Sequence, residues 1–310
     1  MFQFPAKSGS PAQARRPGGA ARLIGSIVAA FTIAGLSLFA FIGRGAAGAK
    51  EPVQVALRPD LSAAVAAAAL GADDKPEKGT GTFKGVVTFK GKPPKRELEF
   101  SKGDSTKVKD VDRAICATED YYKDDILINE KADNAVANVV IYLREAPKGY
   151  KAPPVPEEAA VFDQKGCRFI PHVLLVRCNQ KLLIKNGDGL LHNTNISSTR
   201  NPGFNQAVSP ENRDGVEFSY KKPEGQPIPV KCDLHTWMKA YHLPLDHPFS
   251  AVTDENGKFE IKGLPPGKYE FYVWHEKPGY LDRKLTVEIK ADEITEDKLS
   301  YTAAKFKVGS

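Results

Sequence analysis

From residue 80 onward, the sequence is a series of short runs rich in β-branched and aromatic residues, separated by turn-forming residues. The first run, Thr82 to Lys90, roughly alternates apolar and polar positions and ends at the turn Gly91 to Pro94. Such runs are typical of β-strands that bury one face. Further runs occupy residues 135–143, 173–176, 182–184, 216–220, 228–231, 268–275 and 284–289. The pattern predicts an all-β fold built as a β-sandwich, with long loops in the polar stretch 95–133.

One later stretch combines strand and turn signals. Ala251 to Ile261 places Asn256-Gly257 between two apolar runs, which predicts a hairpin with this dipeptide at its turn. A second turn is expected at Gly263 to Gly267, because its two central prolines cannot continue a strand.

Residues 1–49 have the features of a targeting segment. Leu23 to Gly43 is apolar, uncharged and long enough to cross a bilayer. It follows a basic flank made by Lys7, Arg15, Arg16 and Arg22. Basic flanks stay inside, so we expect the rest of the chain to be extracytoplasmic, in the periplasm or cell envelope. Ala47 to Ala49 offers a cleavage site, so the segment is either a cleaved signal peptide or a membrane anchor formed by residues 23–43. Residues 50–80 are expected to be a linker.

The charge balance argues against one class of partner. The chain has 44 lysines and arginines against 38 aspartates and glutamates, a net charge of +6. Proteins that bind nucleic acid gather their basic residues on one face or helix, and this sequence shows no such cluster. No nucleic-acid partner is therefore expected.

A metal-binding pattern stands near the middle of the strand-rich region. Cys232-Asp-Leu-His235-Thr-Trp-Met238 spaces a thiol, an imidazole and a thioether three residues apart, and Met238 is the only methionine besides Met1. Soft sulfur ligands suit Cu(I), imidazole suits both copper oxidation states, and a weak axial thioether is typical of blue copper sites. The fourth ligand should be a second histidine, and His192 is the best candidate. Zinc is a poorer match because it does not recruit a thioether.

The remaining histidines are given other roles. His172, at a strand start, is the main rival of His192 as the upstream ligand. His242 and His247 lie beyond Met238 and are read as fold-supporting or surface residues, and His275 as structural. Six histidines with no His-x-His pair do not provide the clusters of a multicopper enzyme, so no enzymatic activity is expected.

Two further side chains belong beside the metal ligands. Asn193 follows His192 directly and is expected to steady the ligand loop as a partner of the ligands. Trp237 is expected to shield the metal or to line an exposed docking patch.

Four cysteines leave three after Cys232 is assigned to the metal. Three pairings are then open, each leaving one thiol over. Cys116 with Cys167 is the favoured disulfide, since Cys178 lies in a strand turn.

The central part of the sequence resembles the cupredoxins, the blue copper proteins. The resemblance covers roughly residues 160–245 and rests on Phe169 to Val176, Leu182 to Asp188, His192-Asn193 and Cys232-x-x-His235-x-x-Met238. The two-residue gap before Met238 is most similar to the amicyanin-type loop. The resemblance implies a Greek-key sandwich with one type 1 copper ion, bound by His192, Cys232 and His235 in a plane and by Met238 axially. It also implies that His235 is the solvent-near exit for electrons.

The flanks resemble a second family, the carboxypeptidase regulatory-like or transthyretin-type β-sandwich module. Its opening half is similar to Gly85 to Pro93 followed by Ala137 to Leu143, and its closing half to Thr253 to Tyr269. The expected organisation is therefore a copper segment at 156–247, within or beside a module whose halves are residues 81–155 and 248–310.

Three functions are consistent with these features. The first is single-electron transfer by a type 1 copper centre with a redox protein as partner. The second is copper binding or storage in the cell envelope without a redox role. The third is a structural or ligand-binding β-sandwich whose copper site is incidental.

Overall fold

The computed structural model describes residues 78–308, and nearly all of its regular structure is β-strand. The predicted all-β fold is therefore confirmed. The described residues contain two short α-helices, α2 (Asp110–Cys116) and α3 (Ala303–Phe306), and one 3₁₀ turn, η1 (Glu130–Ala132). The predicted targeting segment and most of the predicted linker lie outside the described residues. Within the described part of the chain, we find no helix with the length and apolar character needed to span a bilayer.

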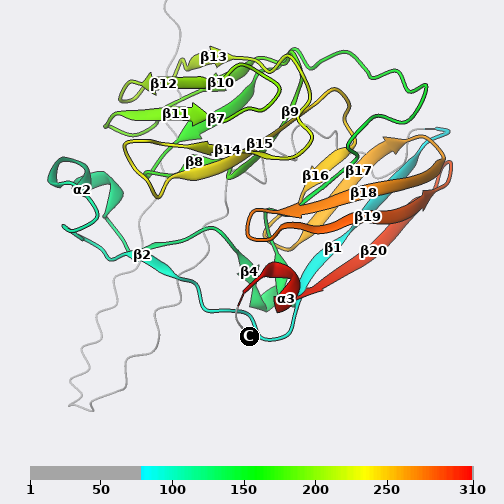
Figure 1. Cartoon of the computed structure of the whole chain (residues 1–310), viewed down its shortest axis with the longest axis horizontal. Helices are drawn as coiled ribbons and strands as arrows, with labels where there is room; N and C mark the ends of the chain where they lie inside the picture. The colour runs from blue at the N-terminus through cyan, green and yellow to red at the C-terminus, as the bar shows by residue number, and fades with distance from the viewer. Residues whose placement is uncertain (1–77, 309–310) are drawn as a thin grey trace, which may run out of the picture. The chain divides into compact units, whose positions relative to one another are not determined.

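The first of two β-sandwiches is built from both ends of the described chain, and we call it the flanking sandwich. One of its sheets has the order β17-β1-β5-β4, with β20 also paired to β1, and the other has the order β16-β6-β18-β19. Figure 1 shows β18 and β19 as a long antiparallel pair, coloured orange to red. The strands are β1 (Gly81–Lys90), β4 (Ile128–Asn129), β5 (Ala135–Val136), β6 (Val140–Tyr142), β16 (Ser250–Val252), β17 (Lys258–Leu264), β18 (Gly267–His275), β19 (Gly279–Ile289) and β20 (Ile294–Thr302).

Strand β1 is the centre of the first sheet. It pairs antiparallel with β17 on one edge and parallel with β20 on the other. Phe83, Val87 and Phe89 alternate along it and are buried in the sandwich core, as its period-2 pattern predicts. Gly85 is required by close packing, because a Cβ there would lie 2.1 Å from the backbone oxygen of Asp297 in β20.

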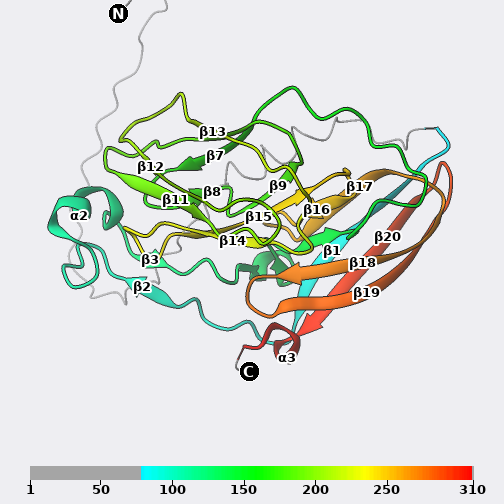
Figure 2. The same cartoon turned by 45° about the horizontal axis from the view of Figure 1, so that its top comes forward.

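The second sandwich lies between β6 and β16 in the sequence, and we call it the inserted sandwich. One sheet has the order β13-β10-β7-β8 and the other the order β12-β11-β14-β15-β9, and Figure 2 shows these strands in green and yellow. The chain leaves the flanking sandwich after β6 and returns at β16, which pairs directly with β6. The strands are β7 (Ala160–Gln164), β8 (Phe169–Ile170), β9 (Val173–Arg177), β10 (Leu182–Ile184), β11 (His192–Ile196), β12 (Phe204–Val208), β13 (Val216–Phe218), β14 (Ile228–Lys231) and β15 (Lys239–Leu245).

Each sandwich has its own apolar core, and a third apolar cluster joins the two. This third cluster contains Val140 and Tyr142 of β6, Trp274 of β18, and Leu243 and Leu245 of β15. Full burial of such side chains stabilises a fold by about 1.5–3 kcal/mol each. The inserted sandwich is therefore packed against the flanking one rather than tethered to it by linkers.

Two local predictions need correction. The run 135–143 is not one strand, because Asn138 adopts a left-handed conformation (φ 61°) and sends β5 and β6 into different sheets. The turn at Asn256-Gly257 forms, but it does not close a hairpin, since β16 pairs with β6 and β17 pairs with β1. Glycine is needed there, since Gly257 has a φ of 71° and a Cβ would lie 2.4 Å from the oxygen of Val87.

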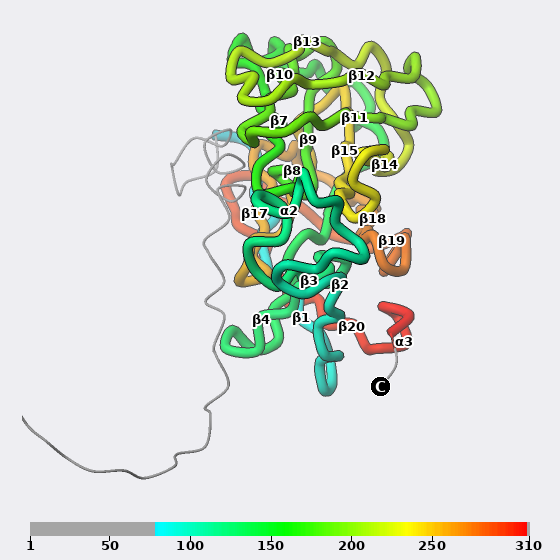
Figure 3. The backbone as a smooth tube through the Cα atoms, turned by 90° about the vertical axis from the view of Figure 1, so that its left-hand side faces the viewer, coloured from blue at the N-terminus to red at the C-terminus, as the bar shows by residue number. Residues whose placement is uncertain are grey.

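The polar stretch after β1 makes an excursion of loops and short elements. It contains β2 (Leu98–Phe100), α2 and β3 (Tyr121–Tyr122), and β2 pairs with β3. Figure 3 shows these elements as one continuous excursion of the backbone, in teal. Its buried side chains, among them Phe100 and Tyr121, belong to the core of the inserted sandwich. We call residues 98–122 the cap.

Candidate metal centre

Two segments of the inserted sandwich bring the predicted ligands together. His192 is the first residue of β11, and Cys232 and His235 lie in the loop between β14 and β15. Two backbone hydrogen bonds close this loop: Cys232 N donates to Met238 O at 3.2 Å, and Met238 N donates to His235 O at 2.9 Å. Because β11 pairs with β14, the start of one strand lies beside the loop that follows the other.

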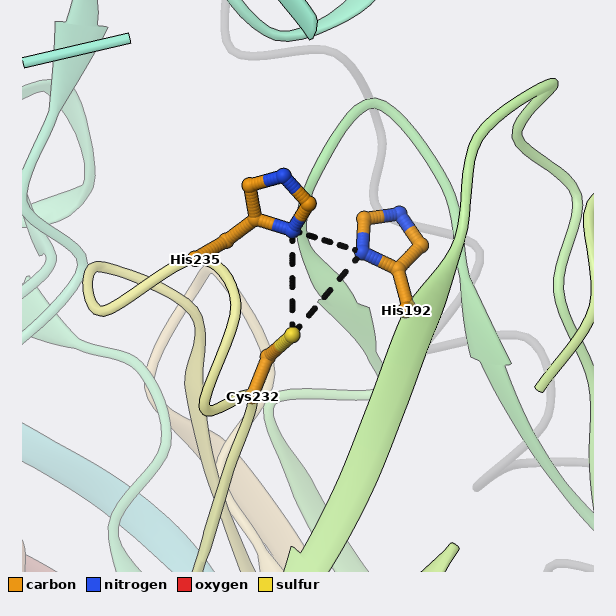
Figure 4. Close-up of side chains that lie close together, drawn as sticks. All are labelled: His192, Cys232 and His235. Carbon is orange, nitrogen blue, oxygen red and sulfur yellow. Dashed lines mark hydrogen bonds between the residues drawn. The ribbon is translucent and has the colours of Figure 1, made fainter. Parts of the chain in front are cut away.

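Three donor atoms converge in this place, as Figure 4 shows. The Nδ1 atoms of His192 and His235 are 3.0 Å apart. The sulfur of Cys232 lies 4.0 Å from Nδ1 of His192 and 3.7 Å from Nδ1 of His235. All three side chains are buried, with exposed fractions of 0% for His192, 1% for Cys232 and 2% for His235.

The outer nitrogen of each imidazole contacts a carboxylate. Nε2 of His192 lies 2.9 Å from Oδ2 of Asp188, and Nε2 of His235 lies 3.3 Å from Oδ2 of Asp112. An ionised carboxylate only accepts hydrogen bonds, so Nε2 of His192 donates its proton to Asp188, while Asp112 lies beside Nε2 of His235. In the metal-free protein the two Nδ1 atoms and the Cys232 sulfur share hydrogen bonds, and loss of the Nδ1 protons would leave lone pairs that face each other and the sulfur. The cluster is arranged to receive a cation.

The surroundings shift the pKa values of the cluster in a consistent direction. Burial raises the pKa of the Cys232 thiol, but hydrogen bonds from His192 and His235 outweigh this and lower it to about 6. Burial likewise lowers the pKa of His192, and its hydrogen bonds to Asp188 and Cys232 raise it above the ordinary value. For Asp188, burial raises the pKa, while His192 and two backbone N–H groups hold it below its usual range. The thiolate is thus readily formed at neutral pH, which is the form that binds metals.

Asn193 joins the two ligand segments. Its Oδ1 accepts the backbone N–H of Asp233 at 2.7 Å and lies 3.3 Å from the Cys232 sulfur. Its Nδ2 donates to Oδ2 of Asp233 at 2.9 Å. The Asp233 carboxylate also accepts hydrogen bonds from Asn195 and Asn205. These contacts, with Asn195 as the largest cause, lower the pKa of Asp233 to about 2. Asn193 therefore contacts the Cys232 loop as predicted. Asp233, Asn195 and Asn205, which the sequence did not suggest, belong to the same hydrogen-bond network.

The other two residues of the predicted site lie in the same loop. Met238 is fully buried in the apolar core that also contains Cys232. Trp237 is half-buried, and its ring lies 5.2 Å from the ring of His235 and 5.0 Å from that of Phe100. Trp237 therefore covers the His235 side of the cluster.

The donor atoms fit a single first-row metal ion. With metal–nitrogen bonds of about 2.1 Å and metal–sulfur bonds of about 2.3 Å, two nitrogens bound to one ion lie at most about 4.2 Å apart, and nitrogen and sulfur at most about 4.4 Å. The three separations of 3.0, 3.7 and 4.0 Å lie within these limits. One thiolate and two imidazoles in a dry site suit copper, and also zinc, while a thioether favours copper.

The rival histidines lie elsewhere. Nε2 of His172 contacts the Glu276 carboxylate, and His172 is not part of the donor cluster. Nδ1 of His242 and the Tyr220 hydroxyl share a hydrogen bond at 2.8 Å, and burial lowers the pKa of His242 to about 3. His247 and His275 are also buried.

The cysteines divide into one pair and two free thiols. A disulfide joins Cys116 of α2 to Cys167, with Cα atoms 5.2 Å apart. Cys178 and Cys232 are free and buried. Burial is also the main reason that the pKa of Cys178 rises to about 11, so this thiol stays protonated.

One prediction for the site is wrong. His235 was expected at the solvent-near exit for electrons, but only 2% of its surface is exposed, because Asp112 and Trp237 cover it. No role was predicted from the sequence for the two carboxylates that contact the imidazoles. Asp188 lies four residues before His192 in a polar loop, which is a usable sequence signal, whereas Asp112 lies in the cap and has none.

Comparison with known proteins supports the two-sandwich description. Residues 214–302 match the profile of the SpaA prealbumin-like fold domain, a range that contains β13 to β15 of the inserted sandwich and β16 to β20 of the flanking sandwich. No curated protein matches the chain. The match gives part of the chain a prealbumin-like character, and the strand arrangement shows two β-sandwiches.

Several solved structures are similar to part of the chain. A reduced amicyanin variant matches 33% of this chain and 99% of its own length, with 13% identity and a TM-score of 0.25. A purple cupredoxin from Nitrosopumilus maritimus matches 28% and 99%, with 14% identity and a TM-score of 0.24. A copper-containing nitrite reductase from Thermus scotoductus matches 33% of this chain, with 18% identity and a TM-score of 0.25, and this chain spans 25% of that enzyme.

Proposed function

We propose that this protein binds one copper ion as a type 1 centre and transfers single electrons outside the cytoplasm. His192, Cys232 and His235 would hold the ion, and Met238 would be the axial ligand of an amicyanin-type loop. The observation that carries the proposal is the convergence of two Nδ1 atoms and one sulfur in a buried place, with a carboxylate beside the outer nitrogen of each imidazole. When bound, copper supplies a reversible one-electron change between Cu(I) and Cu(II).

The chain's own residues prepare the site for this chemistry. Asp188 accepts the Nε2 proton of His192 and Asp112 lies beside Nε2 of His235, which favours metal binding through Nδ1. Asn193 holds the Cys232 loop against β11, which keeps sulfur and nitrogen at constant separations. A rigid, dry ligand set changes little between the two oxidation states, which favours fast electron transfer. Four protein ligands leave no open position for a substrate, so we propose a carrier rather than an enzyme.

We also propose a partner and a location for this protein. The redox partner is proposed to be another protein. The basic flank and apolar run at residues 7–43 favour export to the periplasm or cell envelope, with attachment to the membrane if the segment remains uncleaved.

The visible spectrum of the Cu(II)-loaded protein tests the proposal. A thiolate–copper bond gives an intense visible charge-transfer band, so the intact protein should be strongly coloured. Cys232→Ser should abolish the band. Cys178→Ser is the matched control, since Cys178 is the other free and buried thiol and should not affect the colour. A colourless Cu(II) complex of the intact protein would reject the type 1 assignment.

One observation favours copper storage as the second candidate. All three donors are at most 2% exposed, whereas a carrier needs an accessible edge for its partner. Electron self-exchange separates the two functions: a carrier cycles quickly between Cu(I) and Cu(II), and a storage protein does not.

A further inference from the structure

The cap reaches the metal centre through one carboxylate. Helix α2 carries Asp112, whose Oδ2 lies 3.3 Å from Nε2 of His235. The Asp112 side chain is 16% exposed and that of His235 is 3% exposed. The carboxylate thus lies beside the outer nitrogen of the imidazole and is more exposed to solvent than the imidazole.

A disulfide fastens the cap to the other side of the same centre. Cys116 lies one helical turn after Asp112 and is bonded to Cys167. The backbone N–H of Cys167 donates to Oδ2 of Asp188 at 2.9 Å, and this same oxygen contacts Nε2 of His192. The disulfide therefore joins the helix that bears Asp112 to Cys167, whose backbone N–H binds Asp188.

Aromatic contacts also pack the cap against the loop that bears His235. The rings of Phe100 and Tyr121 stack at 4.8 Å and lie 5.0 and 6.4 Å from the ring of Trp237. The guanidinium of Arg168 lies 3.6 Å over the ring of Tyr121. These contacts hold the cap against the loop that bears His235, so Asp112 is presented on a supported element.

We infer that Asp112 is a positioning residue for His235 and that the cap shields the centre from metal loss. The inference rests on the proposed function, because it assigns a role to residues around the same copper site. The Asp112 carboxylate keeps the His235 proton on Nε2 and strengthens the imidazole as a donor. The negative charge also stabilises the more positive Cu(II) state. The cap excludes water and chelators from the imidazole edge.

Accessibility of His235 in the metal-free protein is the first test. The full chain is treated with diethyl pyrocarbonate, and acylation of His235 is followed by mass spectrometry. Asp112→Ala removes both the acceptor and the charge, whereas Asp112→Asn keeps an acceptor oxygen. The acylation rate should rise in the order wild type, Asp112→Asn, Asp112→Ala. Asp110→Asn is the matched control, because the Asp110 carboxylate is 88% exposed, lies on the same helix and pairs with Arg113.

The copper-loaded protein gives the second test. Copper release to a chelator should be about tenfold faster in Asp112→Asn than in the Asp110→Asn control, as is usual when the partner of a metal-binding histidine is lost. The reduction potential should rise in Asp112→Asn, which a merely structural role would not cause. Equal release rates and equal potentials in the two variants would overturn the inference. If the wild-type protein binds no copper, the proposed function fails, and the acylation order still decides the role of Asp112. If Asp112→Ala does not fold, the comparison of the two asparagine variants decides it.

Discussion

Replacing Asp188 with asparagine tests how firmly the fold prepares the metal centre. The buried Asp188 carboxylate accepts three hydrogen bonds. Its Oδ1 accepts the N–H of Gly166 at 2.6 Å, and its Oδ2 accepts the N–H of Cys167 at 2.9 Å and contacts Nε2 of His192 at 2.9 Å. An asparagine offers one oxygen and one NH₂ group in the same volume. Its oxygen can take the position of Oδ2, and its NH₂ then faces the N–H of Gly166.

The magnitude follows from these contacts. Gly166 is an exposed residue, so water can replace the lost acceptor and the loss costs about 0.5–1.5 kcal/mol. The two remaining hydrogen bonds lose their charge assistance, which weakens each by about 0.5–1 kcal/mol. Asp188→Asn should therefore lower the free energy of unfolding of the metal-free protein by about 1.5–3.5 kcal/mol. His192 would also be held less firmly in its Nδ1-binding tautomer, so copper affinity should fall by about 10- to 100-fold.

Two measurements and one control decide the outcome. Urea unfolding of the metal-free protein gives the stability change, and competition with a chelator of known affinity gives the change in copper binding. Asp163→Asn is the control, because that carboxylate pairs with the exposed Arg213 and is not part of the donor cluster. A surface ion pair of this kind contributes about 0–1 kcal/mol. If Asp188→Asn unfolds at the same urea concentration as the control and binds copper as tightly, Asp188 does not hold His192 in its metal-binding tautomer, and the proposal is wrong.

Two further predictions concern Met238 and the buried histidines. Met238→Leu removes a weak axial donor while preserving volume, so copper should stay bound and the potential measured by voltammetry should rise; an unchanged potential would contradict the axial assignment. Burial lowers the pKa of His242 and of His275 to about 3, from about 6.5 in the unfolded chain, so the unfolded state gains protons first as the pH falls. Each histidine should therefore lower the free energy of unfolding by about 2 kcal/mol between pH 7 and pH 5, as measured by urea unfolding, and a flat profile would argue against this.

The parts of the centre that the sequence suggested are those set by short-range spacing. Cys232, His235 and Met238 lie within one loop, so their proximity follows from the chain itself. His192 could be proposed because it lies in a polar turn between apolar runs. The structure brings His192, Cys232 and His235 together and leaves His172 beside Glu276.

The sequence predicted most strand positions, but it did not predict which strands pair with each other. The run 135–143 is apolar on both sides of Asn138, because β5 and β6 are fully buried, and such a run carries no alternation to show that it breaks there. The Asn256-Gly257 turn was visible, yet a turn does not specify whether its flanking strands pair with each other. In this fold the flanking sandwich supplies other partners for both strands.

Asp112 shows why the cap could not be predicted. It lies in a polar stretch without periodicity, far from His235 in sequence, on a helix of only seven residues. Its position depends on the disulfide between Cys116 and Cys167 and on the packing of Phe100 and Tyr121. Those contacts exist only once the chain has folded, so no local pattern reports them. The expected exposure of His235 was wrong for this reason.

The polar composition of the centre supports a cation in it on energetic grounds. Asp188, His192, Cys232 and His235 are buried together beside the apolar core of the inserted sandwich. Buried ionisable groups destabilise a fold unless each is paired and hydrogen-bonded. A carboxylate lies beside each outer nitrogen, and in the metal-free protein the two Nδ1 atoms and the Cys232 sulfur share hydrogen bonds among themselves. A bound metal cation would satisfy all three at once, so copper should stabilise the folded state as well as serve its chemistry.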